Sequence, residues 1–234
     1  MQNNPLTLTL LAGLALSGAA HADLIGRDLN GSAGSFEAYY DTDLDITWLA
    51  DANYAQTSGS DTDGMMTWAA ANTWAANLSF VDPVNNRTYD NWRLPTVTDK
   101  GTPGCNFAYS NTDCGYNVDT ATGEMAHLFY DELYNEATYD TDGYPQLGEG
   151  LINTRPFINL QRDDYWTGTE YAPDTGGAWT FFFPYGLQDA YFKDAAFYAL
   201  AVSPGDVGAV PEAETYALML AGLGLIGWRA RCRG

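Results

Sequence analysis

The C-terminal end of the chain limits what the rest can fold into, because it resembles a transport signal more than part of a folded domain. An acidic hinge around Pro211 precedes an apolar run at residues 216–228, and three arginines follow it at 229, 231 and 233. As a helix this run would span about 20 Å, which is short for a hydrocarbon core of about 30 Å. The arginines favour a cytoplasmic position for that end. The sequence therefore predicts a short membrane helix at 216–228.

The N-terminal residues carry the pattern of a secretory signal peptide. An apolar stretch at residues 6–16 is followed by small residues and by Ala20-His21-Ala22, which is typical of a signal-peptidase cleavage site. We therefore expect three parts: a signal peptide at 1–22, an exported domain at 23–209, and a sorting segment at 210–234. The middle part is long enough to form one domain with a core of its own.

The exported part is strongly acidic. It holds 7 of the 10 lysines and arginines and 28 of the 30 acidic residues, which gives a formal net charge of −21. Such a charge excludes nucleic acid and anionic lipid as favoured partners. It suits solubility, cation binding, or contact with neutral or basic polymers. The frequent aromatic residues indicate a folded domain.

Two helices and a later β-region are predicted inside this domain. Apolar spacing favours helices at 67–78, where Thr67 is the expected N-cap, and at 124–134. Alternating runs at 165–171, 178–183 and 191–202 favour antiparallel strands, since turn residues separate them. The order of these elements predicts an α+β domain with two helices and a mainly antiparallel sheet.

Few residues suggest chemistry. Cys105 and Cys114 lie in one loop of an exported chain, so we predict a disulfide between them. Asp140 and Asp142 space oxygen ligands as calcium requires, although solvated turn aspartates are the simpler interpretation of this pattern. His127 is the one histidine outside the signal peptide, which excludes a multi-histidine metal cluster and favours a structural role. No catalytic set is evident, so we expect a protein that is not an enzyme.

The tail closely resembles the PEP-CTERM sorting signal. The resemblance rests on Val-Pro-Glu-x-Glu-Thr at 210–215, the apolar run and the arginines, and it assigns the signal to Pro211 and Glu212. One departure is Ala213, where the family has a second proline. The resemblance implies exosortase as the processing partner, a Gram-negative source, and an inner-membrane precursor that later reaches the cell surface, outer envelope or extracellular matrix. Whether the tail is cleaved or retained stays open.

The middle of the chain resembles the Lcl C-terminal domain family, a domain of unknown function. The resemblance rests on residues 40–49, Trp-Arg-Leu-Pro-Thr at 92–96, Tyr-Trp-Thr-Gly-Thr-Glu at 165–170, Ala-Trp-Thr-Phe at 178–181 and Ala-Leu-Ala-Val at 199–202. It implies a C-type-lectin-like fold. Ser203 departs from the family, where arginine is common, and the calcium signatures of lectins are absent. In the 92–96 motif, we expect Arg93 to pair with a carboxylate and hold the fold together.

These observations favour an exported surface or matrix protein that binds polysaccharide or another surface protein in the envelope or biofilm. The acidic charge argues against sulfated glycans, because like charges repel. Two alternatives stay open: a structural matrix component without a specific ligand, and an enzyme acting on polysaccharide.

Overall fold

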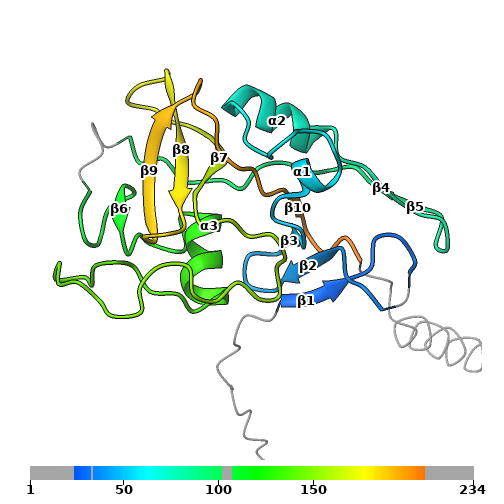
Figure 1. Cartoon of the computed structure of the whole chain (residues 1–234), viewed down its shortest axis with the longest axis horizontal. Helices are drawn as coiled ribbons and strands as arrows, with labels where there is room; N and C mark the ends of the chain where they lie inside the picture. Colours follow the sequence, from blue (N-terminus) through cyan, green and yellow to red (C-terminus); the bar gives the residue numbers. More distant parts are fainter. Residues whose placement is uncertain (1–23, 33, 102–106, 209–234) are drawn as a thin grey trace, which may run out of the picture.

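The computed structural model describes residues 24–32, 34–101 and 107–208, which form two four-stranded antiparallel sheets with short helices beside them (Figure 1). The first sheet has the order β1 (Leu24–Arg27), β2 (Ala38–Asp41), β3 (Ile46–Leu49) and β10 (Val202–Pro204). The second has the order β6 (Gly115–Tyr116), β9 (Leu187–Phe192), β8 (Gly177–Phe182) and β7 (Asp164–Glu170). A separate hairpin joins β4 (Phe80–Asp82) to β5 (Arg87–Tyr89). The predicted mixed helix and antiparallel strand content is confirmed.

The first sheet begins with a tight hairpin between β2 and β3 that Asp41 stabilises. Asp41 Oδ1 accepts the backbone amides of Asp43 and Leu44, both at 3.0 Å. Asp45 closes the turn with a φ of 51°, a left-handed conformation that aspartate tolerates better than most residues. Strand β10 then pairs with β3, so the last described strand completes the sheet that the first strands began.

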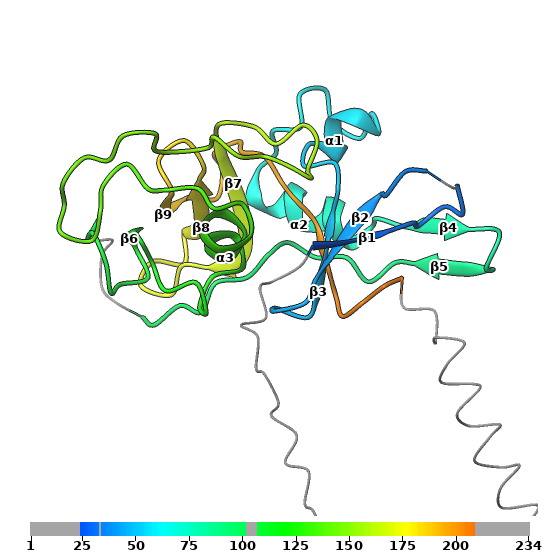
Figure 2. The same cartoon turned by 90° about the horizontal axis from the view of Figure 1, so that it is seen from below.

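The two ends of the domain lie together beside the first sheet. Arg27 Nε on β1 is 2.6 Å from Asp206 Oδ1, just beyond β10. Figures 1 and 2 both show this corner on the side of the molecule away from β6, β8 and β9. The last described residues therefore lie on the side of the domain away from the second sheet.

Both predicted helices form, with differences in detail. α2 spans Trp68–Ala76, and Thr67 occupies its N-cap position without a side-chain capping bond. α3 spans Glu124–His127 and continues as one turn of π-helix over Leu128–Glu132. The apolar pattern did not predict this change of register. A short helix, α1 (Tyr54–Thr57), was also not predicted.

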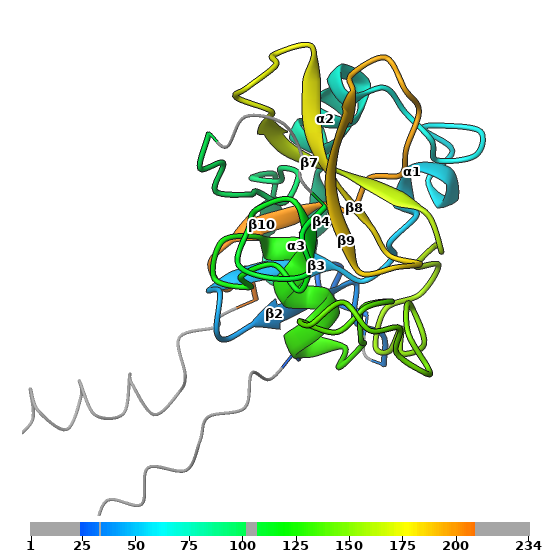
Figure 3. The ribbon, with the colours of Figure 1, turned by 90° about the vertical axis from the view of Figure 1, so that its left-hand side faces the viewer.

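Aromatic residues fill the core between the second sheet and α3, which packs against its face (Figure 3). Phe129 on the π-helix contacts Phe181 and Phe183, with ring centroids 5.3 and 5.9 Å apart. Trp48 and Trp166, from different sheets, are fully buried. The tryptophans of the sequence motifs thus serve mainly as core.

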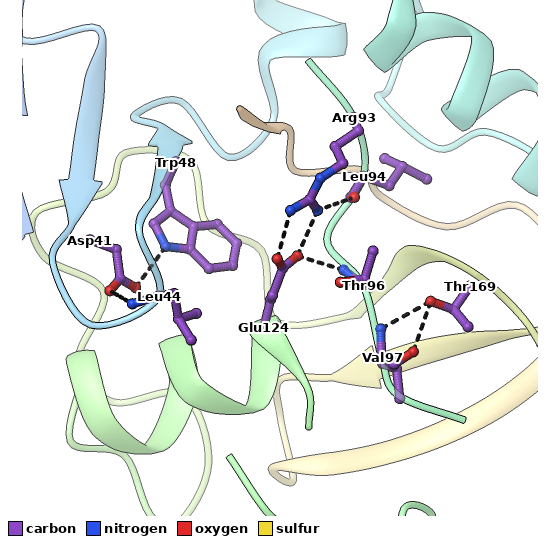
Figure 4. Close-up of polar contacts among 9 residues, drawn as sticks. All are labelled: Asp41, Leu44, Trp48, Arg93, Leu94, Thr96, Val97, Glu124 and Thr169. Carbon is purple, nitrogen blue, oxygen red and sulfur yellow. Dashed lines mark hydrogen bonds and ion pairs between the residues drawn. The ribbon is translucent and has the colours of Figure 1, made fainter. Parts of the chain in front are cut away.

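The motif at 92–96 joins the elements of the core, as Figure 4 shows. Arg93 makes a two-pronged ion pair with Glu124, the first residue of α3, with both N–O distances at 2.7 Å. Glu124 also accepts the Thr96 amide at 2.6 Å. On the next segment, Val97 exchanges hydrogen bonds with the Thr169 hydroxyl. The expected pairing of Arg93 with a carboxylate is confirmed.

The strand predicted at 191–202 is wrong. β9 begins earlier and ends at Phe192, a turn follows, and only Val202–Pro204 forms β10. Between them the chain crosses from the second sheet to the first and makes isolated bridges, with Phe197 to Met66 and Tyr198 to Tyr165. Burial alternates only over residues 193–196, whereas residues 199–201 are all buried, so this crossing is core packing and not a continuous ladder.

The predicted signal peptide at 1–22 and membrane helix at 216–228 lie outside the described residues. Within the described ranges, we find no helix that is both long enough and apolar enough to span a bilayer.

Candidate functional site

A largely apolar hollow lies where β9 ends and β8 begins, at the upper end of these strands in Figure 1. It encloses about 610 Å³ and is open on one side. Its walls come from three segments: the chain at Phe107, the turn between β7 and β8, and the end of β9. The lining residues are Phe107, Tyr171, Pro173, Asp174, Gly177, Asp189, Ala190, Tyr191 and Phe192.

Aromatic rings at this hollow are unusually accessible. Phe107 is 49%, Tyr191 50% and Phe192 67% exposed. Tyr191 and Phe192 lie at the end of β9, whereas β6 pairs with the strand only at Leu187 and Gln188. Beyond Gln188, the described part of the chain places no strand along that edge. Flat apolar surface with few polar groups is what a ligand site usually offers.

Hydrogen bonds fix the wall that the β7–β8 turn provides. Asp99 Oδ2 accepts the Ala172 amide at 2.6 Å and the indole N–H of Trp179 at 2.9 Å. The ring of Tyr171 packs edge-on against Trp179, with centroids 5.1 Å apart. These contacts hold the wall in place without a ligand, so the hollow is largely preformed.

Two carboxylates border the hollow. Asp189 is half-buried; burial raises its pKa, although its bond from the Ala190 amide at 2.7 Å acts in the opposite direction. Asp174 is exposed and accepts the Gly176 amide at 3.0 Å. Because Asp174 is exposed, it can also accept a hydrogen bond from a hydroxyl or amino group of a ligand.

A third carboxylate, Asp164 on β7, has an unusual pKa but does not line the hollow. Its pKa is raised to about 7, mainly by burial; a hydrogen bond with Thr180 acts in the opposite direction, and the charges of Asp163 and Asp189 contribute to the rise. A protonated carboxyl at neutral pH can act as a general acid when it faces a substrate. Here Asp164 is not among the residues that line the hollow.

The residues singled out from the sequence do not gather at this hollow. Cys114 is disulfide-bonded, but Cys105 lies outside the described residues, so their pairing stays a prediction. Asp140 Oδ1 accepts the amides of Asp142 and Tyr144, at 3.0 and 2.8 Å, which makes it part of a turn. Pro211 and Glu212 also lie outside the described residues. The calcium site at Asp140 and Asp142 remains a prediction.

His127 has a denser carboxylate environment than the sequence suggested. Its side chain is 8% exposed and lies near Asp41, Asp131 and Glu132. Burial lowers its pKa, yet the hydrogen bond to Glu132 and the three negative charges outweigh burial and raise the pKa overall. Among the described residues, Asp41, His127 and Glu132 form the one group that could hold a metal ion.

Sequence reasoning missed the hollow, since its walls are distant in the chain. Phe107 follows the cysteine loop, whereas Asp189 and Phe192 lie on a strand that was predicted to start at Tyr191. The one available signal was the density of aromatic residues. That signal does not separate exposed rings from core rings.

No curated protein and no solved structure matches the chain. The C-type-lectin-like fold therefore stays a prediction. One family model matches, over residues 209–233: the PEP-CTERM protein-sorting motif. This motif implies export, a membrane-associated precursor and processing by exosortase. The chain thus carries the sorting signal of an exosortase-processed surface protein.

Proposed function

We propose that the exported domain binds a neutral or amino-sugar polysaccharide in the cell envelope or extracellular matrix, through the hollow at the end of β9. The single observation that carries this proposal is the set of exposed rings of Phe107, Tyr191 and Phe192 beside the carboxylates of Asp174 and Asp189. Aromatic faces pack against the C–H faces of sugar rings, and carboxylates accept hydrogen bonds from sugar hydroxyl groups.

The position of the hollow supports this role. The chain leaves the domain toward its sorting segment beside Arg27 and Asp206, on the side away from β8 and β9 (Figures 1 and 2). While the precursor is held at the membrane, the hollow is therefore free to face outward. This arrangement suits an adhesive surface protein, and it is compatible with the C-type-lectin-like fold that the sequence motifs suggest.

The charge of the domain sets the class of polysaccharide. A net charge of −21 over residues 23–209 repels sulfated and other anionic glycans. Neutral glycans carry no such penalty, and amino sugars gain from the carboxylates. A surface protein with a basic, apolar segment could use the same hollow, and competition with oligosaccharides would distinguish the two ligands.

A polysaccharide-acting enzyme is the alternative that Asp164 suggests, because a pKa of about 7 suits a general acid. We favour binding without turnover, since Asp164 is not in the lining and Asp174 is tied to its own turn. Measurable release of reducing sugar that Asp164→Asn abolishes would reverse this preference.

Affinity electrophoresis of the exported protein tests the proposal with three gels: a neutral glucan, a chitosan-type polymer and a sulfated glycan. Each is run with calcium and with chelator. We expect saturable retardation in one of the first two. The double substitution Phe107→Ala/Phe192→Ala should weaken it about 30-fold or more, the effect of losing a typical binding hot spot.

Tyr144→Ala is the matched control, because this ring is 69% exposed in a loop that does not line the hollow. It should bind as the unaltered protein does. Absence of saturable binding in every gel would remove the lectin role and leave the structural matrix role. Equal losses in the control and the double variant would place binding elsewhere.

A further inference from the structure

Three buried side chains from different elements meet away from the hollow. Asp41 is the last residue of β2, His127 the last of α3, and Glu132 the last of the π-helix. Asp41 is 0% exposed, and the side chain of Glu132 is 2% exposed. One nitrogen and two oxygens, one from each residue, all lie within 4.8 Å of one another. The hairpin that carries Asp41 lies over the helix that carries the other two.

The π-helical turn brings His127 and Glu132 together. In a π-helix the backbone bond runs five residues along the chain, and such turns are frequent at functional sites. His127 Nε2 is 3.3 Å from Glu132 Oε1, five residues on, while Nδ1 is 3.1 Å from Asp131 Oδ2, four residues on. Each ring nitrogen therefore faces a different carboxylate.

The distances between these side chains match the spacing of ligand atoms around a shared ion. His127 Nε2 lies 3.7 Å from Asp41 Oδ2 and 3.3 Å from Glu132 Oε1. The first distance is too long for a hydrogen bond and the second is weak. Ligand atoms about 2.1 Å from a tetrahedral ion would be separated by roughly 3.4 Å.

We propose that Asp41, His127 and Glu132 bind a divalent transition-metal ion of the zinc class. Imidazole nitrogen and carboxylate oxygen are ligands that zinc accepts, whereas calcium prefers six or more oxygens. A bound ion would also balance the negative charge of these carboxylates. Among the described residues, their ion pairs all involve a single partner, His127.

The surrounding contacts match those that orient ligands in metal sites. Asp131 holds Nδ1 of His127, which directs Nε2 toward the ion; a carboxylate behind a metal-bound histidine is a recurrent arrangement. The Trp48 indole donates to Asp41 Oδ2 at 3.2 Å, and backbone amides hold Oδ1 (Figure 4). Asp131 is thus a positioning residue. The bound ion joins the β2–β3 hairpin to α3.

The full-length chain, freed of metal with chelator, is titrated with zinc chloride by calorimetry and with cobalt(II) by visible absorption. We expect one zinc per chain at this site, a higher melting temperature with zinc, and cobalt bands of a tetrahedral N/O site. Glu132→Gln should abolish the bands. Asp131→Asn should weaken zinc binding about 10- to 100-fold, as loss of a histidine's carboxylate partner does elsewhere.

Asp140→Asn is the matched control, because that aspartate lies in a surface turn and should leave zinc affinity unchanged. Asp131→Asn decides the matter if Glu132→Gln fails to fold, since the Asp131 side chain is 44% exposed. Two results overturn the proposal: zinc binding that neither variant weakens, and no zinc-dependent rise in melting temperature. If zinc does not raise the melting temperature, the negative charge of the carboxylates is balanced by protonation of His127 and not by a metal ion.

Discussion

The ion pair between Arg93 and Glu124 should be a major source of stability, and Glu124→Gln is the substitution that tests it. Glu124 receives three bonds: two from the guanidinium at 2.7 Å and one from the Thr96 amide at 2.6 Å. The side chains of Arg93 and Glu124 are 34% and 15% exposed, so water screens the pair only in part. Glutamine keeps the shape but loses the charge and turns an amino group toward Arg93 or Thr96.

The expected cost follows from these contacts. A hydrogen bond to a charged group contributes about 1.5–3 kcal/mol when buried, and partial exposure places this network toward the low end. We expect Glu124→Gln to lower the free energy of unfolding by about 2–3 kcal/mol. For a domain of this size each kcal/mol shifts the melting temperature by about 2–4 °C.

Urea unfolding followed by circular dichroism measures this difference. The slope of the free energy of unfolding against urea concentration should be the same in both proteins, which shows that unfolding exposes the same surface. Glu170→Gln is the matched control, because Glu170 pairs with Lys193 at the surface and is 47% exposed. Its cost should stay below about 1 kcal/mol. Equal costs for the two variants, or a cost below 0.5 kcal/mol for Glu124→Gln, would refute the reasoning.

Two further predictions concern a buried acid and the tail. Asp164 has a pKa near 7 in the fold, against an ordinary value of 3.8, so the folded state binds more protons between these values and stability falls as pH rises through that range. Asp164→Asn should therefore stabilise the protein at pH 8 by at most about 4 kcal/mol and change little at pH 4, which thermal unfolding at both pH values checks. Glu212→Ala should leave the sorting segment uncleaved, whereas Glu214→Ala should still be cleaved. Mass spectrometry of the C-terminus measures this, and normal cleavage of both variants would contradict the prediction.

The sequence predicted the parts of the fold that depend on local pattern. The helices at 67–78 and 124–134 have apolar residues at helical spacing, and both form where expected. The partner of Arg93 could be expected as a class, a carboxylate, but not as Glu124, because the contact depends on how α3 lies against the 92–96 segment.

Features that depend on tertiary structure escaped prediction. The crossing at 193–201 was predicted as part of a strand, yet it makes only isolated bridges, and its residues 199–201 are all buried in the core. The meeting of His127 with Glu132 requires a π-helical register that apolar spacing does not distinguish from an α-helix. The aromatic hollow brings together residue 107, the turn after β7 and the end of β9, which are far apart in the chain.

Hydrogen exchange of the exported protein, with and without the polysaccharide that retards it best, tests the central claim most directly. Binding at the hollow predicts slower exchange confined to the segment after residue 107, the turn at 171–177 and the end of β9 at 189–192. Protection centred elsewhere, for example on the loop at 140–150, or no change in exchange at saturating polysaccharide, would contradict it.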